Sequence, residues 1–143
     1  MSHAEAQAFF ETYRDAFNRL DGDAVADLWH TPSGIADSHG PGGAARLTWW
    51  VDEAPMRANH RALCGVYAGA DYGHAEFSIT DHLAMGPHHA LTQVDWTLHR
   101  RDASVLQRFA TGYQLIRTGA GPRVLLCVAH AENLKEMTPH AAQ

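Results

Sequence analysis

The segment His88–Arg101, HHALTQVDWTLHRR, alternates between mostly apolar and polar side chains. One set of alternate positions holds Ala90, Thr92, Val94, Trp96 and Leu98. The other set holds Gln93, Asp95, Thr97 and His99. Alternation with a period of two predicts an antiparallel strand with one face buried and the other facing water.

Similar extended segments lie on both sides of this strand: Gly73–Met85, Val105–Thr118 and Arg123–His130. The connections between successive segments are short and turn-like: Gly86-Pro87, Arg101–Ser104 and Gly119–Pro122. Such connections favour hairpins between neighbours, so we expect a four-stranded antiparallel meander. Long strands twist, and a twisted sheet cannot cover its own apolar face. The residues before Gly73 must therefore pack against it.

Those earlier residues predict helices at about 2–20, 23–29 and 49–67, which makes the fold α+β. The first begins with a capping box, Ser2 and Glu5, and its apolar stripe is strongly aromatic. Pro32–Asp37 is expected to form a short strand, followed by a flexible loop at Ser38–Gly43. Pro55 indicates either a kink in the third helix or a new helix start.

Length and composition favour one domain over residues 1–143, with residues 131–143 as a loose tail. The net charge is −5 and there is no basic run, which argues against nucleic acid or an anionic membrane as partner. No signal peptide or membrane-spanning segment is evident, so we expect a cytoplasmic protein. Cys64 and Cys127 are isolated and fit buried thiols better than a disulfide. No cofactor is predicted.

The order of these elements resembles the NTF2-like superfamily, and within it the SnoaL-like and ketosteroid isomerase-like group. The resemblance spans about residues 4–130 and rests on three stretches: YRDAFN with DGD at 13–23, LW before IAD at 28–37, and RFATGYQL at 108–115. It implies a cone in which three N-terminal helices pack in the concave face of a long curved antiparallel sheet and leave a pocket. It also implies a homodimer formed through the outer sheet face, which would carry Gln93, Arg108 and Gln114.

The resemblance further implies that Tyr13 is an oxyanion-hole donor and Asp37 a general base. An aspartate in an apolar cavity has a raised pKa and can take a proton next to a carbonyl, while a phenol stabilises the enolate. Tyr113 stands where that family carries a protonated carboxylic acid. Each residue also has a structural interpretation: Tyr13 as core, Asp37 as the acceptor of an Asx turn, and Tyr113 as pocket wall without catalysis.

The expected ligand-binding residues are Trp96, Phe109, Met56, Phe17 and His39. Eleven histidines are unusual in 143 residues, but their spacing matches no metal motif, so no metal site is predicted. His82 and His99 could face the pocket only if strand parity allows it, as in scytalone dehydratase-like members. Two functions remain open. One is an isomerase, dehydratase or cyclase acting on a small apolar carbonyl compound, and the other is a non-catalytic ligand-binding or dimerisation module.

Overall fold

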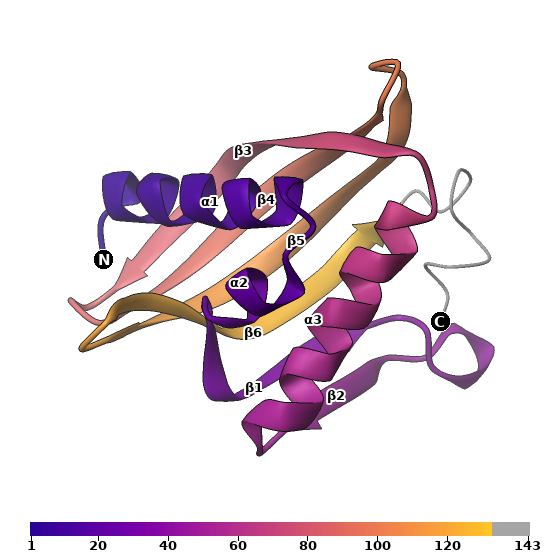
Figure 1. The fold of residues 1–143 in the computed structure, drawn as a ribbon. Coiled ribbons are helices and arrows are strands. Elements are labelled where there is room, and N and C mark those ends of the chain that lie inside the picture. The colour runs from indigo at the N-terminus through magenta and orange to yellow at the C-terminus, as the bar shows by residue number, and fades with distance from the viewer. Residues whose placement is uncertain (133–143) are drawn as a thin grey trace.

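The computed structural model describes residues 1–132. Within this range the helices α1 (His3–Asn18), α2 (Gly22–Ala26) and α3 (Glu53–Ala68) lie over one face of a single sheet (Figure 1). The sheet has six strands in the order β2-β1-β6-β5-β4-β3. Their bounds are Trp29–Asp37 (β1), Arg46–Trp50 (β2), Tyr72–Met85 (β3), His89–Arg100 (β4), Val105–Thr118 (β5) and Gly121–Glu132 (β6). The predicted α+β architecture is confirmed.

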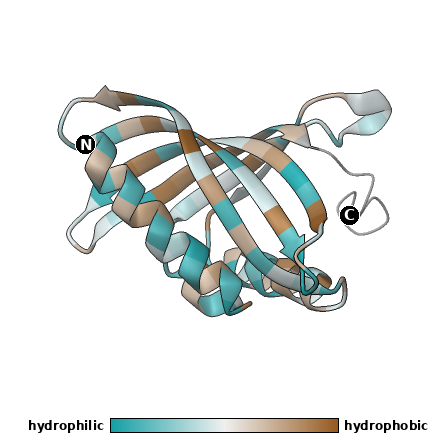
Figure 2. Cartoon of the chain, turned by 90° about the horizontal axis from the view of Figure 1, so that it is seen from above, coloured by the Kyte–Doolittle hydropathy of each residue, from teal (hydrophilic) through white to brown (hydrophobic). Residues whose placement is uncertain are grey.

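The predicted meander is also confirmed, because β3, β4, β5 and β6 pair antiparallel in chain order. Each of these strands agrees with its predicted bounds to within two residues. The alternation of side chains is visible as successive brown and teal bands along the twisted strands (Figure 2). The strand β6 runs on to Glu132, so Ala131 and Glu132 do not belong to a loose tail. The remainder of the predicted tail lies outside the described residues.

The region before α3 differs from the prediction. Arg46–Trp50 is not part of a loop and helix but forms β2, which pairs antiparallel with β1. The helix itself begins at Glu53, with Asp52 as its N-cap. Pro55 therefore lies in the first turn, where a missing backbone N–H costs nothing, and it marks a new helix start rather than a kink.

The strand β1 is longer than expected and joins the meander in an unexpected way. It starts at Trp29 rather than at Pro32, because α2 ends at Ala26. It pairs parallel with β6, so that Ile35 lies opposite Cys127. The register of this pairing shifts between Trp29 and Gly34, around Pro32, which has no N–H to donate to a ladder. This pairing connects the N-terminal half of the chain to the meander.

The helix α1 covers the concave face of the sheet with aromatic side chains. The predicted capping box is present: Ser2 Oγ accepts a hydrogen bond from the Glu5 amide, and the Glu5 carboxylate accepts one from the Ser2 amide. Phe9, Phe10, Tyr13 and Phe17 are all buried against the sheet. The Phe10 ring lies 4.8 Å from the ring of Tyr113 on β5. None of the helices in residues 1–132 is long and apolar enough to cross a membrane.

The end of α1 is fixed to the sheet by Asn18. Its Oδ1 accepts hydrogen bonds from the Tyr72 hydroxyl and from the Ala75 amide on β3, both at 2.8 Å. The same carboxamide oxygen thus satisfies one side-chain donor and one backbone donor. This contact positions the C-terminal end of α1 over β3, beside the residues that line the cavity described below.

Replacing Asn18 with Ala should lower the free energy of unfolding by about 1–3 kcal/mol, because both donors lose their acceptor. Urea denaturation measures this change. Thr12→Ala is the matched control, since Thr12 is exposed on α1 and should shift stability by less than about 0.5 kcal/mol. Equal stability of the two variants would contradict the proposed role of Asn18.

Candidate functional site

A cavity of about 160 Å³ lies between the helices and the concave face of the sheet. Among its lining residues are the expected Tyr13, Phe17, Trp96, Phe109 and Tyr113. The sequence did not single out other members of the lining as site residues: Trp29, His60, Tyr67, Gln107, Thr111 and Cys127. The structure thus brings together both predicted tyrosines and most of the predicted aromatic wall.

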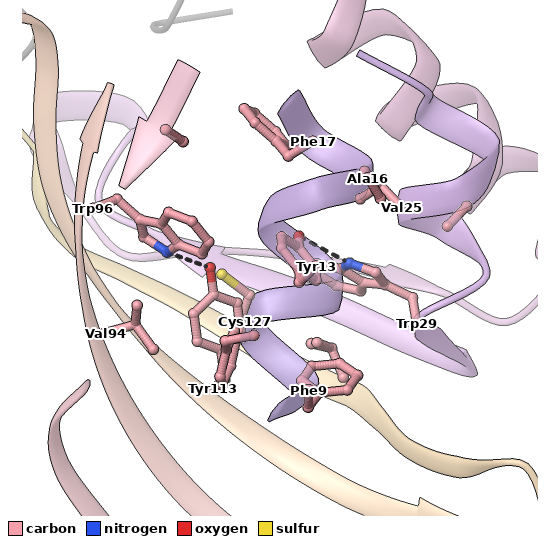
Figure 3. Packing of buried hydrophobic residues seen from close by; sticks show 14 of the residues in the cluster. Phe9, Tyr13, Ala16, Phe17, Val25, Trp29, Val94, Trp96, Tyr113 and Cys127 are labelled. Atoms are coloured by element: carbon pink, nitrogen blue, oxygen red, sulfur yellow. Dashed lines mark hydrogen bonds between the residues drawn. The ribbon is translucent and has the colours of Figure 1, made fainter. Parts of the chain in front are cut away.

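Two neighbouring tryptophan–tyrosine pairs form part of this wall (Figure 3). The Trp29 indole N–H donates to the Tyr13 hydroxyl at 3.2 Å, and the Trp96 indole N–H donates to the Tyr113 hydroxyl at 3.0 Å. An indole N–H can only donate, so each phenol oxygen accepts here and keeps its own O–H to donate elsewhere. Burial raises the pKa of both phenols. They are therefore neutral hydrogen-bond donors at physiological pH.

His60 on α3 lines the cavity and carries an unsatisfied polar atom. Its side chain is buried, and Nε2 has no hydrogen-bond partner in residues 1–132. Burial, assisted by the positive charge of Arg57, lowers its pKa to about 4. The ring lies 4.5 Å from that of Trp29. The Nε2 atom of this neutral imidazole can form a hydrogen bond with a bound molecule.

Gln107 and Thr111 are the other polar side chains that β5 contributes to the lining, and both are buried. Gln107 Oε1 accepts a hydrogen bond from the Tyr67 hydroxyl of α3 at 3.2 Å. This bond joins α3 to β5 across one end of the cavity and fixes the orientation of the Gln107 amide. The cavity is therefore apolar with a few oriented polar groups, the arrangement typical of small-molecule sites.

Asp37 does not lie with Tyr13, contrary to the expected catalytic pair, because it is not among the residues that line the cavity. It lies opposite Arg46 in the β1–β2 pairing. The Arg46 guanidinium donates to both of its carboxylate oxygens, at 3.1 and 2.8 Å, and the His39 amide donates to Oδ1 at 2.9 Å. Burial alone would raise the pKa of Asp37, but these hydrogen bonds outweigh it and lower the pKa. The contact with the His39 amide is the Asx turn that was the structural alternative.

The remaining predicted ligand-binding residues also lie elsewhere. Met56 is buried but does not line the cavity, and His39 contacts Asp37 through its amide. His82 lies beside the N-terminus, where its ring contacts the Met1 carbonyl and Thr92. His99 follows the parity of the outward-facing positions of β4, so it does not reach the cavity.

Sequence signals for the missed members of the lining did exist. His60 shares a helical stripe with Met56, Leu63 and Tyr67, and Gln107 shares the parity of Phe109, Thr111 and Tyr113 on β5. Polar residues on an otherwise buried face indicate a site or a specific hydrogen bond. Trp29 was not predicted to line the cavity because its position was assigned to a helix rather than to β1.

Helices packed in a curved, mostly antiparallel sheet around an internal cavity define the class of NTF2-like α+β cones. The chain belongs to the family described as NTF2-like protein (DUF6841), which matches residues 4–132. No curated protein matches the sequence.

Solved structures with the same fold cover nearly all of the chain at low sequence identity. A ketosteroid isomerase-like protein from Erwinia carotovora atroseptica is 16% identical, with a TM-score of 0.62 over 90% of this chain and 94% of the other. An NTF-2 like protein of unknown function from Shewanella oneidensis is 14% identical, with a TM-score of 0.68 over 91% and 99%. A domain of unknown function with a cystatin-like fold from Nostoc punctiforme is 14% identical, with a TM-score of 0.68 over 96% and 83%. At these identities the similarity describes the fold alone.

The lowered pKa of His60 predicts a specific loss of stability in acid. A histidine in the unfolded chain has a pKa of about 6.5, whereas the pKa of His60 in the folded state is about 4. Folding therefore disfavours protonation of His60. The stabilisation is complete above pH 6.5 and is lost as the pH falls through 4. Relative to His60→Gln, the wild-type protein should lose about 3 kcal/mol of unfolding free energy between pH 7 and pH 4.

Urea denaturation at several pH values measures this difference. The carboxylates titrate in both proteins, so subtracting the two curves isolates His60. Parallel curves for the two proteins would show that His60 is not held neutral in the folded state.

Proposed function

We propose that the protein binds a small, mostly apolar molecule with one hydroxyl or carbonyl group in the cavity between the helices and the sheet. The observation that carries this proposal is the buried His60 Nε2, which has no partner in residues 1–132 and belongs to a ring lining an aromatic cavity. A buried polar atom without a partner costs about 1–3 kcal/mol, so a ligand that satisfies it gains binding energy.

The volume of the cavity limits the size of the ligand. An apolar cavity of about 150 Å³ in another protein holds a benzene molecule, and drug-sized ligands need roughly 300–1,000 Å³. At about 160 Å³ this cavity suits a single ring and is too small for a steroid nucleus. The proposed ligand is therefore monocyclic.

The polar groups around the cavity favour a ligand oxygen. The hydroxyls of Tyr13 and Tyr113 keep a proton to donate, and neutral His60 has one donor and one acceptor nitrogen. A ligand carbonyl can accept from such donors, and a ligand hydroxyl can also donate. A purely apolar ring of the same size would leave these groups unsatisfied and should bind less tightly.

Binding is favoured over general-base catalysis by Asp37. No acidic side chain is among the residues within 1–132 that line the cavity. Asp37 is held by Arg46 and its pKa is lowered, which makes it a weaker base than a free carboxylate. We therefore favour the ligand-binding interpretation over an isomerase, dehydratase or cyclase that uses Asp37.

Isothermal titration calorimetry with matched monocyclic probes tests the proposal. Phenol and cyclohexenone should bind with one site per chain, and toluene should bind more weakly. His60→Phe should reduce the affinity for phenol by about fivefold, the value of one hydrogen bond, and change toluene binding much less. Bound probes should also raise the melting temperature.

Cavity-filling variants show where the probes bind. Ala129 lines the cavity, so Ala129→Leu, which replaces a methyl group with an isobutyl group, should abolish binding. Ala62→Leu on the exposed face of α3 makes the same change outside the cavity and should leave binding intact. Asp37→Asn should leave affinity unchanged. Equal affinity of wild type and Ala129→Leu, or no binding of any probe, would contradict the proposal.

We further propose that the chain forms a homodimer through the outer face of the sheet. Large apolar side chains are exposed on this face: Leu83 at 57%, Leu91 at 44% and Val128 at 37%. Leu83 lies opposite Leu91 in the β3–β4 register, so the two form one cross-strand row. An exposed apolar patch on a broad sheet face supports an interface.

Light scattering after size exclusion should give twice the chain mass of 15.7 kDa at micromolar concentration. Leu91→Glu should give a monomer, because it places a charge at the centre of the patch. Leu47→Glu on the edge strand β2 is the control, since Leu47 is also exposed to water, at 63%, but lies at the opposite end of the sheet order. A monomeric wild-type protein would contradict the dimer.

A further inference from the structure

His74, Glu76 and His99 form a cluster on the face of the sheet that points away from the helices. His74 and Glu76 are two residues apart on β3 and so point to the same side. His99 on β4 lies directly opposite His74 in the register of the two strands. The two imidazole rings stack at 4.6 Å, with an angle of 11° between their planes.

The potential ligand atoms of the three residues converge. One atom from each lies within 4.8 Å of the others. The Glu76 carboxylate is 3.7 Å from His74 Nε2 and 3.4 Å from His99 Nε2. Tetrahedral zinc with bonds of 2.0–2.2 Å to nitrogen and oxygen separates its ligand atoms by roughly 3.3 Å. Small movements of His74 and Glu76, which are 45% and 68% exposed, would complete that geometry.

The tautomer of His99 is fixed by the hairpin between β4 and β5. His99 Nδ1 lies 3.0 Å from the carbonyl oxygen of Ala103. A carbonyl can only accept, so Nδ1 carries the proton. The turn that presents this carbonyl is itself ordered, because the Asp102 carboxylate accepts hydrogen bonds from both the amide and the hydroxyl of Ser104. A backbone carbonyl that holds the far nitrogen is a common support for a metal-binding histidine.

With its proton on Nδ1, the His99 ring has a lone pair on Nε2 that can bind a cation. In the neutral ring the lone pair of His99 Nε2 faces the negatively charged Glu76 oxygen at 3.4 Å. The Nε2 atom is buried and makes no hydrogen bond within residues 1–132. A metal ion uses all three groups at once.

We propose that His74, Glu76 and His99 bind a Zn²⁺ ion on the outer face of the sheet. Two imidazoles and one carboxylate form a ligand set suited to zinc, and they leave a fourth position open to water or to an external ligand. Imidazole ligands disfavour the harder Mg²⁺ ion. None of the three residues lines the cavity, so this site is separate from the proposed ligand-binding function. Its β3 ligands also lie seven and nine residues along the strand from Leu83, roughly 23–30 Å from that part of the apolar patch.

Zinc titration of the chelator-treated full chain by calorimetry tests the proposal. We expect one tight equivalent per chain and no comparable binding of Mg²⁺. Co²⁺ at the same site should give the intense visible absorption of a tetrahedral complex. Because the chain has eleven histidines, the site must also be located with variants.

His99→Ala should weaken zinc binding at least tenfold, since even loss of a supporting contact costs 10–100-fold. Glu76→Gln keeps the shape of an exposed side chain, so it should fold normally and also weaken binding at least tenfold. His88→Ala, in the β3–β4 turn, is the control and should bind as the wild type does. If His99→Ala fails to fold, the zinc affinity of Glu76→Gln alone tests the assignment. No zinc binding by the intact chain, or wild-type affinity in Glu76→Gln, would overturn the assignment.

Discussion

The structure depends on covering the concave apolar face of one long, curved sheet. A sheet of this curvature buries only the strand positions of one parity, and it needs aromatic side chains from outside to fill the curve. The helix α1 supplies them with Phe10, Tyr13 and Phe17. These rings pack at the tilted angles that aromatic pairs prefer: the Tyr13 ring meets those of Trp96 and Tyr113 at 45° and 61°. The cavity lies between these rings and α3, which contributes His60, Leu63 and Tyr67 to its lining.

The parts of the fold that rest on local patterns could be predicted from the sequence. Alternation located β3 to β6, and the capping box located the start of α1. The strand β2 and the parallel pairing of β1 with β6 could not be predicted, because both are contacts between distant segments. Arg46–Trp50 is short and precedes a helix, so its local sequence does not distinguish a strand from the beginning of that helix. Pairing with β1 determines that this segment is a strand.

The candidate site was likewise predictable from the sequence only in part. Tyr13 and Tyr113 were named as site residues through the family resemblance, and both line the cavity, as do the expected Trp96 and Phe109. Asp37 was misplaced because its environment is set by Arg46, which lies nine positions later on the strand that was not predicted. The position of a carboxylate at the end of a strand does not by itself predict its role. Whether it acts as a base or forms an ion pair depends on its partner. One missing strand therefore changed the expected chemistry of the residue.

The period of two in the meander also explains why His74 and His99 do not line the cavity. On β4 the even-numbered positions from Ala90 to Leu98 are buried, so His99 and the other odd-numbered positions face outward. On β3 the buried Ala75 places His74 and Glu76 on that same outer face. At this end of the sheet, β3 and β4 thus place buried side chains on the inner face and His74, Glu76 and His99 on the outer face. Because the sheet separates the two sets, a change of charge or metal content on the outer face need not alter the cavity. The fold can therefore carry two independent binding functions on one set of strands.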